Sequence, residues 1–186
     1  MLIDLSDIKY TRWPTHLGNI KITSDNAPQN MAEAWEWFDR HNCLVKPRPT
    51  DDNMYCINAF EQYEMPAACW ELINAFDEDD WVINDPGIDG KVRQQCTGLI
   101  GDGKPGTTNG LRWHKDTNPI VAMNIVGNSE WFFKRPNNHS IKMKPGDCLY
   151  VPTGITHKVI ADAQRFTLGF NLRYEGISYK TPDSLQ

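Results

Sequence analysis

Three residues of this 186-residue chain have the types and spacing to bind a metal ion. His114 and Asp116 stand one residue apart in the stretch LRWHKDTNP, directly after a glycine-rich loop. On a β-strand, residues two apart project from the same face, so both side chains could reach one ion. The pair alone is a weak signal, because a surface strand of mixed polar residues has the same pattern. A metal site therefore needs a third ligand from elsewhere in the chain.

His157, in the stretch GDCLYVPTGITHKV, is the candidate third ligand. It stands at the start of an expected strand, after a proline–glycine turn that fixes its approach. The spacing of Gly146, five residues, Pro152, one residue, Gly154, two residues and His157 is far more specific than the histidine–aspartate pair. Two imidazoles and one carboxylate are typical of sites for divalent first-row metals.

The elements that must position these residues follow from the apolar periodicity. In 30–42 and 59–80, apolar residues recur at three and four, which predicts two amphipathic helices, with Pro66 in the first turn of the second. The stretch 44–55 between them is expected to be a loop. After residue 90 the period shifts to two, with turn signals every eight to twelve residues. The expected strands are 91–100, 111–116, 120–126, 130–135, 139–144, 147–151, 157–161 and 165–174.

Eight short, evenly spaced strands predict a jelly roll or barrel packed against the helices. The last strand supports this, because one of its faces is apolar and the other is polar and carries two arginines. We expect the apolar face to pack on the helices and the polar face to line the barrel interior. The whole chain is expected to form one domain, with a helical support region (1–90), a β core (91–176) and a loose tail (177–186).

The motif that ends in His157 matches the second sequence motif of the cupins. With HKD upstream, residues 91 to 174 resemble the Fe(II)- and 2-oxoglutarate-dependent oxygenases of the double-stranded β-helix fold, in particular their JmjC-related branch. The resemblance implies that His114, Asp116 and His157 bind Fe(II) and are the catalytic centre. It also implies 2-oxoglutarate as co-substrate, O₂ as oxidant and hydroxylation of a protein side chain or a small molecule.

One departure from other cupins supports the oxygenase reading. Where those proteins usually carry a glutamate as fourth ligand, this chain has the apolar residues Ile120 and Val121. Three protein ligands leave one face of an octahedral ion free, as in the facial triad of non-haem iron oxygenases. A bidentate oxo acid and O₂ together need those three positions.

The resemblance also suggests which residues bind the co-substrate. Arg165 and Thr167 resemble an Arg-x-Ser/Thr signature of the last core strand, and an arginine can grip a carboxylate with two parallel hydrogen bonds. Lys134 is a rival anchor, because some JmjC-type members use a lysine of the fourth core strand, and Arg173 is a third. Asn124, ten residues after His114, matches a JmjC-type position that contacts the oxo acid. We favour Arg165 as the anchor.

The charge, hydropathy and cysteine content of the chain disfavour nucleic-acid-binding, membrane and secreted proteins. A net charge of −5 and a pI near 5.5 disfavour nucleic-acid binding, and no apolar run is long enough to span a bilayer. The N-terminus lacks the pattern of a signal peptide, and five cysteines without a CxxC pair predict reduced thiols. We therefore expect a cytoplasmic protein without a membrane partner. Related folds often dimerise through helical segments, so a homodimer is one expected assembly.

Two other readings stay open at this level. A metal-binding cupin enzyme that does not use 2-oxoglutarate would keep the triad and leave Arg165 and Asn124 without that role. A jelly-roll binding module without a metal would need neither histidine. Trp113, Trp131 and Phe132 could shape a substrate pocket but are more often core residues, and the loop 101–110 is expected beside the site entrance.

Overall fold

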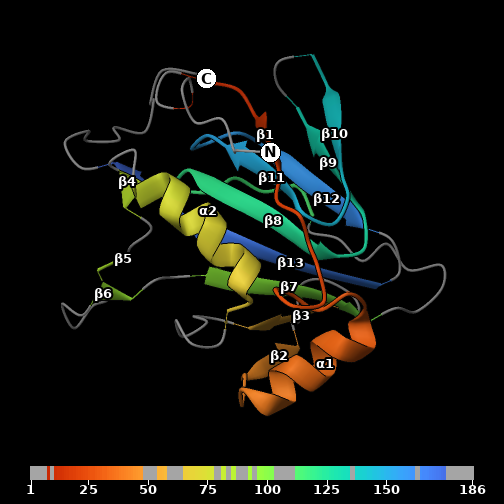
Figure 1. The fold of residues 1–186 in the computed structure, drawn as a ribbon. Coiled ribbons are helices and arrows are strands. Elements are labelled where there is room, and N and C mark those ends of the chain that lie inside the picture. Colours follow the sequence, from red (N-terminus) through yellow and green to blue (C-terminus); the bar gives the residue numbers. More distant parts are fainter. Residues whose placement is uncertain are drawn as a thin grey trace.

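The described part of the chain forms two main antiparallel β-sheets that face each other, with two helices on the outside of the larger sheet (Figure 1). The computed structural model describes residues 8, 11–47, 54–57, 65–77, 81–82, 85–86, 92–93, 96–102, 112–134, 137–161 and 164–174. Its helices are α1 (Met31–Arg40) and α2 (Ala67–Asp77). Its strands are β1 (Thr15–Asn19), β2 (Val45–Pro47), β3 (Met54–Ile57), β4 (Trp81–Val82), β5 (Asp85–Pro86), β6 (Val92–Arg93), β7 (Cys96–Asp102), β8 (Ile120–Val126), β9 (Ser129–Phe133), β10 (His139–Met143), β11 (Asp147–Val151), β12 (His157–Ala161), β13 (Gln164–Asn171) and β14 (Arg173–Tyr174).

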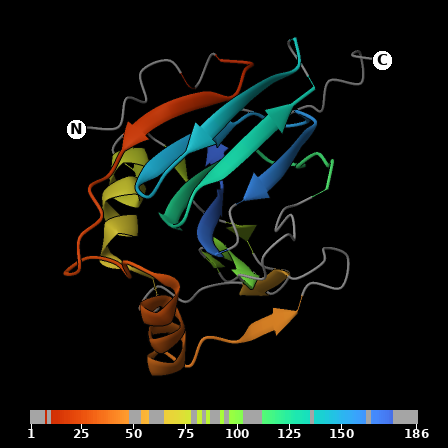
Figure 2. The same ribbon diagram turned by 90° about the vertical axis from the view of Figure 1, so that its right-hand side faces the viewer.

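The larger sheet has the strand order β1-β11-β8-β13-β7-β3-β2 and the smaller one β10-β9-β12. Non-consecutive neighbours such as β11, β8, β13 and β7 are the crossovers of a jelly roll. The chain thus has the mainly β, double-stranded β-helix architecture expected from its sequence, as two stacked sheets rather than a fully closed barrel. Figure 2 shows the small sheet in front, with α2 on the far side of the large sheet. β14 and β4, and β5 and β6, form two small separate pairs.

Most expected core strands are present. Strands β8, β11 and β12 have the predicted bounds, and β7, β9, β10 and β13 differ from the predictions by a few residues at their ends. The strand expected at 111–116 is wrong: His114 makes an isolated bridge to His157, and its neighbours are not in a strand. The ladder ends there because the Asp116 carbonyl accepts from the Gly154 N–H, one residue out of the register that the bridge sets.

The N-terminal half contributes more than helices. Strand β1 pairs with β11 at one edge of the large sheet, while β3 and then β2 extend its other edge beyond β7. The expectation that 44–55 is a loop is therefore wrong for β2 and β3. The sequence signal was weak because β2 has three residues and β3 four, too few to show a period of two.

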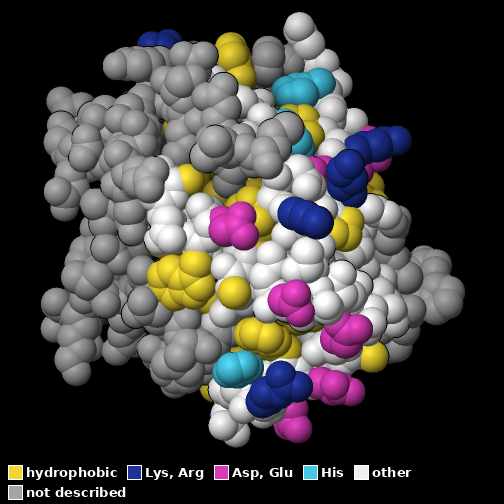
Figure 3. Space-filling view, in the orientation of Figure 1, with side chains coloured by type: hydrophobic (Ala, Val, Ile, Leu, Met, Phe, Trp, Pro, Cys, Tyr) yellow, Lys and Arg dark blue, Asp and Glu magenta, His cyan; other side chains and the backbone are white. Residues whose placement is uncertain are grey.

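Both helices pack an apolar face on the large sheet. Helix α1 begins at an Asn30 cap whose side chain accepts from the Glu33 N–H at 3.0 Å, and α2 begins directly after Pro66. Phe38 meets Phe166 of β13 edge to face at 4.9 Å, which fixes α1 against the sheet. The solvent side of α1 is acidic, and these side chains gather over α1 in the lower part of Figure 3.

Apolar and polar side chains alternate along β13, as predicted, so its two faces belong to two different buried regions. Phe166, Leu168 and Phe170 join the core under the helices, which also contains Leu72 and Phe76 of α2. The other face of the large sheet packs against the small sheet through a second apolar cluster: Ala122, Trp131, Phe133, Met143, Leu149, Val151 and Val159. The polar residues of β13 therefore lie between the two sheets. No helix in the described ranges is long and apolar enough to cross a membrane.

The turn between β8 and β9 depends on a glycine. Gly127 has a φ of +75°, and a Cβ there would lie 2.1 Å from the carbonyl oxygen of Gln164 at the start of β13. Gly154 has the same backbone conformation, with a φ of +76°, but nothing lies within 4 Å of its Cβ position. We expect Gly127→Ala to lower the free energy of unfolding by about 2–4 kcal/mol and Gly154→Ala by only about 1 kcal/mol.

Urea unfolding of the two variants and wild type checks this difference. Equal losses would mean that the close approach of the β8–β9 turn to β13 does not constrain the sheet.

Candidate metal centre

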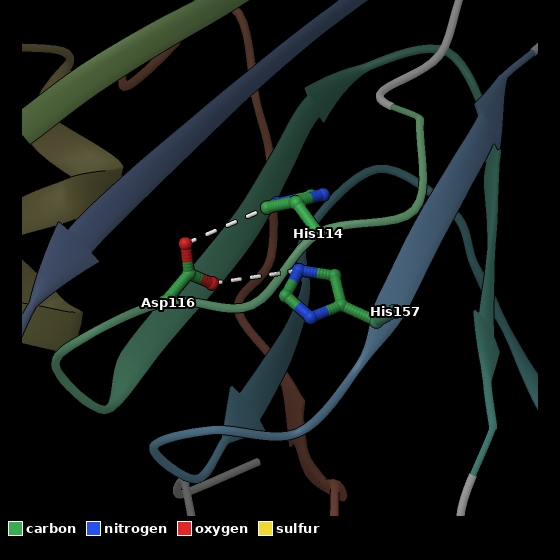
Figure 4. Close-up of side chains that lie close together, drawn as sticks. All are labelled: His114, Asp116 and His157. Atoms are coloured by element: carbon green, nitrogen blue, oxygen red, sulfur yellow. Dashed lines mark ion pairs between the residues drawn. The ribbon is translucent and has the colours of Figure 1, made fainter.

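His114, Asp116 and His157 converge at the end of the jelly roll where β12 begins (Figure 4). Their nearest ligand atoms all lie within 4.8 Å of one another. The Asp116 carboxylate faces both rings, with Oδ1 3.9 Å from His114 Nε2 and Oδ2 3.5 Å from His157 Nε2. The structure therefore brings together the three residues that the motifs singled out, although His114 and Asp116 come from an irregular segment and not from a strand.

Backbone carbonyls orient both imidazole rings. His114 Nδ1 lies 2.7 Å from the Arg112 oxygen and His157 Nδ1 lies 2.9 Å from the Ile155 oxygen. A carbonyl oxygen can only accept, so each Nδ1 carries a proton and Nε2 is the ring nitrogen that faces Asp116. Metal-ligating histidines are oriented in the same way, with the other ring nitrogen held by an outer hydrogen bond.

Two buried atoms of the triad lack a hydrogen-bond partner from the protein. His157 is fully buried, and its Nε2 and the Asp116 Oδ2 have no hydrogen-bond partner in the described structure. Burial lowers the pKa of His157 below its ordinary value, and the nearby His114 acts in the same direction. Two imidazoles and one carboxylate, with one imidazole nitrogen and one carboxylate oxygen buried and without a hydrogen-bond partner, fit a divalent transition metal.

A buried polar chain runs from His157 into the interior. Trp131 stacks on the His157 ring, with centroids 5.4 Å apart, and its Nε1 donates to Ser129 Oγ at 3.2 Å. Asn124 Nδ2 donates to Ser129 Oγ and to the Met143 carbonyl, while its Oδ1 accepts from Ser129 and from Thr167 Oγ1. Asn124 thus ties β8 to its neighbours and has all four hydrogen-bonding positions occupied by protein groups.

Arg165 lies deeper on the same inner face and has no anionic partner among the described residues. It is fully buried, and its Nε and Nη1 make no hydrogen bond. Its pair on β7 is Gly101, whose own pair on β3 is Met54. The side chain reaches toward β3, with Nη2 4.0 Å from Met54 Sδ. Burial lowers the pKa of Arg165 to about 10.

Lys134 and Arg173 are the other two residues expected as possible anchors of the co-substrate carboxylate. Neither is seen beside Arg165 in the described structure. Lys134 is exposed, and its ammonium lies 5.0 Å from the centre of the Trp113 ring, beside that of Lys158. Because Lys158 follows the inward-facing His157 on β12, this location is on the outer face of the small sheet. Arg173 belongs to β14, but its side chain is outside the described structure. The same holds for residues 103–110 of the expected entrance loop.

Sequence reasoning missed residues that support the site from neighbouring strands. Ser129 faces inward on β9, one residue before the strand expected from the sequence. Trp131 was expected as a core residue or part of a substrate pocket, and it is a buried residue that stacks on His157. The contact of Arg165 with Met54 depends on β3 joining the sheet, and no sequence pattern indicated that pairing.

Comparison with known proteins agrees with this architecture. Residues 133–179 match the JmjC domain family. Comparison with curated protein sequences gives no significant match. Among solved structures, YcfD from Escherichia coli is similar over 97% of this chain and 61% of its own, with 16% identity and a TM-score of 0.59. The ribosomal oxygenase YcfD with cobalt and 2-oxoglutarate matches at 15% identity over 98% of this chain and 60% of its own, also at 0.59.

The chain thus has the double-stranded β-helix fold of its structural neighbours, with a segment that matches the JmjC domain family and a triad of candidate metal ligands. It spans about three fifths of the length of YcfD. At this level of identity, the likeness to YcfD shows the fold, and the chemistry of the site must be argued from its own residues.

Removing one ligand tests the metal centre. We expect His114→Ala to weaken anaerobic Co(II) binding by at least about 100-fold, which exceeds the usual effect of losing an outer-shell partner. His16→Ala is the matched control, because this exposed imidazole on β1 lies beside Asp147 and outside the triad. Isothermal titration calorimetry measures both affinities. Equal affinities in the two variants would show that Co(II) binds somewhere else.

Proposed function

We propose that this protein is an Fe(II)- and 2-oxoglutarate-dependent oxygenase that hydroxylates a protein side chain or a small molecule. The observation that carries the proposal is the guanidinium of Arg165, which is fully buried, has no anionic partner among the described residues and leaves Nε and Nη1 without a hydrogen bond. A buried charge without a partner is costly, so such a group indicates an anionic ligand. A dicarboxylate whose other end chelates a metal supplies that anion.

Each residue has a defined task in this proposal. His114, Asp116 and His157 would hold Fe(II), which supplies the activation of O₂. The hydrogen bonds of the two Nδ1–H groups would keep the Nε2 atoms in place for the ion, and the stacked Trp131 ring holds His157 in place. Arg165 would bind the distal carboxylate through two parallel hydrogen bonds, with the Thr167 hydroxyl on the same face. The expected contact of Asn124 with the oxo acid remains a prediction, since its amide is already fully bonded here.

The two alternatives fit the structure less well. A metal-binding cupin without 2-oxoglutarate explains the triad but leaves the Arg165 charge uncompensated. A jelly-roll module without a metal also leaves His157 Nε2 and Asp116 Oδ2 buried without partners. The likeness to YcfD, which has been solved with cobalt and 2-oxoglutarate, supports the oxygenase.

Substitutions of Arg165 and Lys134 test which of the two binds the distal carboxylate of 2-oxoglutarate. We expect Arg165→Met to weaken 2-oxoglutarate binding to the Fe(II) protein by about 100-fold or more, because it removes a buried charged hydrogen-bond partner. Lys134→Met should change that affinity by less than about twofold, since its ammonium lies outside the barrel. Anaerobic calorimetry measures both, and succinate release in air tests turnover. A large loss in Lys134→Met with none in Arg165→Met would contradict the assignment.

Arg165→Met should also stabilise the folded protein when no ligand is bound. The folded state disfavours the Arg165 charge, so its pKa is lower than in the unfolded chain, and this cost is present at all pH values below about 10. Methionine fills a similar volume without a charge, and we expect the free energy of unfolding to rise by about 1–3 kcal/mol at pH 7. Chemical denaturation without oxo acid measures this. A loss of stability would mean that the guanidinium has a protein partner in solution.

A further inference from the structure

A groove of about 540 Å³ lies on the outer face of the small sheet, close to the metal centre. Trp113, Phe132, Lys134 and Lys158 line it, together with Phe133, Asn138 and His139. Trp113 is 42% exposed, although it directly precedes a metal-ligand candidate in the chain. The proposed reaction assigns no task to any of these residues.

The backbone fixes this groove relative to the triad. His114 and His157 exchange two hydrogen bonds of 2.9 Å, so the next residues, Trp113 and Lys158, also lie opposite each other. On β12, adjacent residues alternate in direction, so Lys158 points outward because His157 points inward. The Trp113 ring is on the same outer face, since its centre lies 5.2 Å from the Lys158 ammonium. The groove and the metal centre are on opposite faces of one sheet and share its rim.

The groove is positive and has an aromatic wall. The ammonium groups of Lys134 and Lys158 lie 5.0 and 5.2 Å from the centre of the Trp113 ring, and that of Lys158 also lies 5.0 Å from the Phe132 ring. Cation–π contacts of this kind hold flexible lysines in place. Within the described ranges, no carboxylate is at ion-pair distance from either ammonium. In a chain of net charge −5, this is a local site for an acidic group.

We propose that this groove binds an acidic residue of a polypeptide substrate whose target side chain enters the jelly roll over the shared rim. The proposal rests on the proposed function and narrows its substrate class to polypeptides. A small molecule cannot touch both faces of a sheet, whereas an extended chain can cross the rim. A strand advances only about 3.3 Å per residue, so the acidic residue lies several residues along the peptide from the oxidised one.

A nucleic-acid strand fits the groove less well. Binding a polynucleotide takes a track of positive charge along several phosphates, and the groove offers two lysines in an acidic protein. One or two carboxylates of a peptide match two ammonium groups.

The test uses the full metal-free chain and a fluorescein-labelled Gly/Ser decapeptide with two central glutamates. Its control peptide has glutamines in their place. At physiological salt we expect wild type to bind the glutamate peptide about three- to tenfold more tightly than the glutamine peptide, as measured by fluorescence anisotropy. Lys134→Gln and Lys158→Gln should each remove most of this preference. Lys142→Gln and Lys144→Gln remove the same charge outside the groove and should leave it unchanged.

Three results would overturn the proposal. The two peptides could bind equally or not at all, or the control lysines could matter as much as those of the groove. A labelled dT10 strand that binds more tightly than the glutamate peptide, and loses this in Lys134→Gln and Lys158→Gln, would assign the groove to nucleic acid. Because the assay contains neither metal nor oxo acid, failure of the oxygenase proposal would show in the metal and 2-oxoglutarate titrations and leave these affinities unchanged.

Discussion

The site depends on one backbone contact, the pair of 2.9 Å hydrogen bonds between His114 and His157. These residues are far apart in the sequence, and the segment around His114 is otherwise outside both sheets. The bridge brings the two imidazoles together, and Asp116, two residues after His114, places its carboxylate beside both of them. The same contact sets Trp113 against Lys158 on the reverse face. One pair of hydrogen bonds thus determines both the metal centre and its outer neighbour.

The interior of the jelly roll contains buried polar groups whose loss of hydration destabilises the fold, and a purely structural core would not need them. Apolar residues from both sheets fill most of the interior, and the Asn124 network is fully hydrogen-bonded. Against this background, His157 Nε2, Asp116 Oδ2 and the Nε and Nη1 atoms of Arg165 are buried without a hydrogen-bond partner. A folded protein rarely leaves such groups unpaired unless a ligand completes them. These groups are the physical basis for the proposal that a metal and an anion bind here together.

Much of this could be predicted from the sequence, because the core strands β8 to β13 have clear periodicity and the motif ending in His157 has a specific spacing. The parts that could not be predicted depend on long-range pairing. The segment 111–116 has the composition of a strand, yet its ladder stops after one bridge because Gly154 bonds to Asp116 out of register. Strands β2 and β3 are too short for a periodic signal, so neither the width of the large sheet nor the setting of Arg165 beside Met54 could be foreseen.

The central claim is that the triad holds a metal with room for a chelating oxo acid. The most direct measurement is an anaerobic titration of the protein with Fe(II) and then 2-oxoglutarate, followed by visible absorption. A weak charge-transfer band that appears only after the oxo acid is added, and that is absent in Asp116→Ala, is the result expected for bidentate chelation at this centre. Iron binding without any band in the wild-type protein would contradict the account.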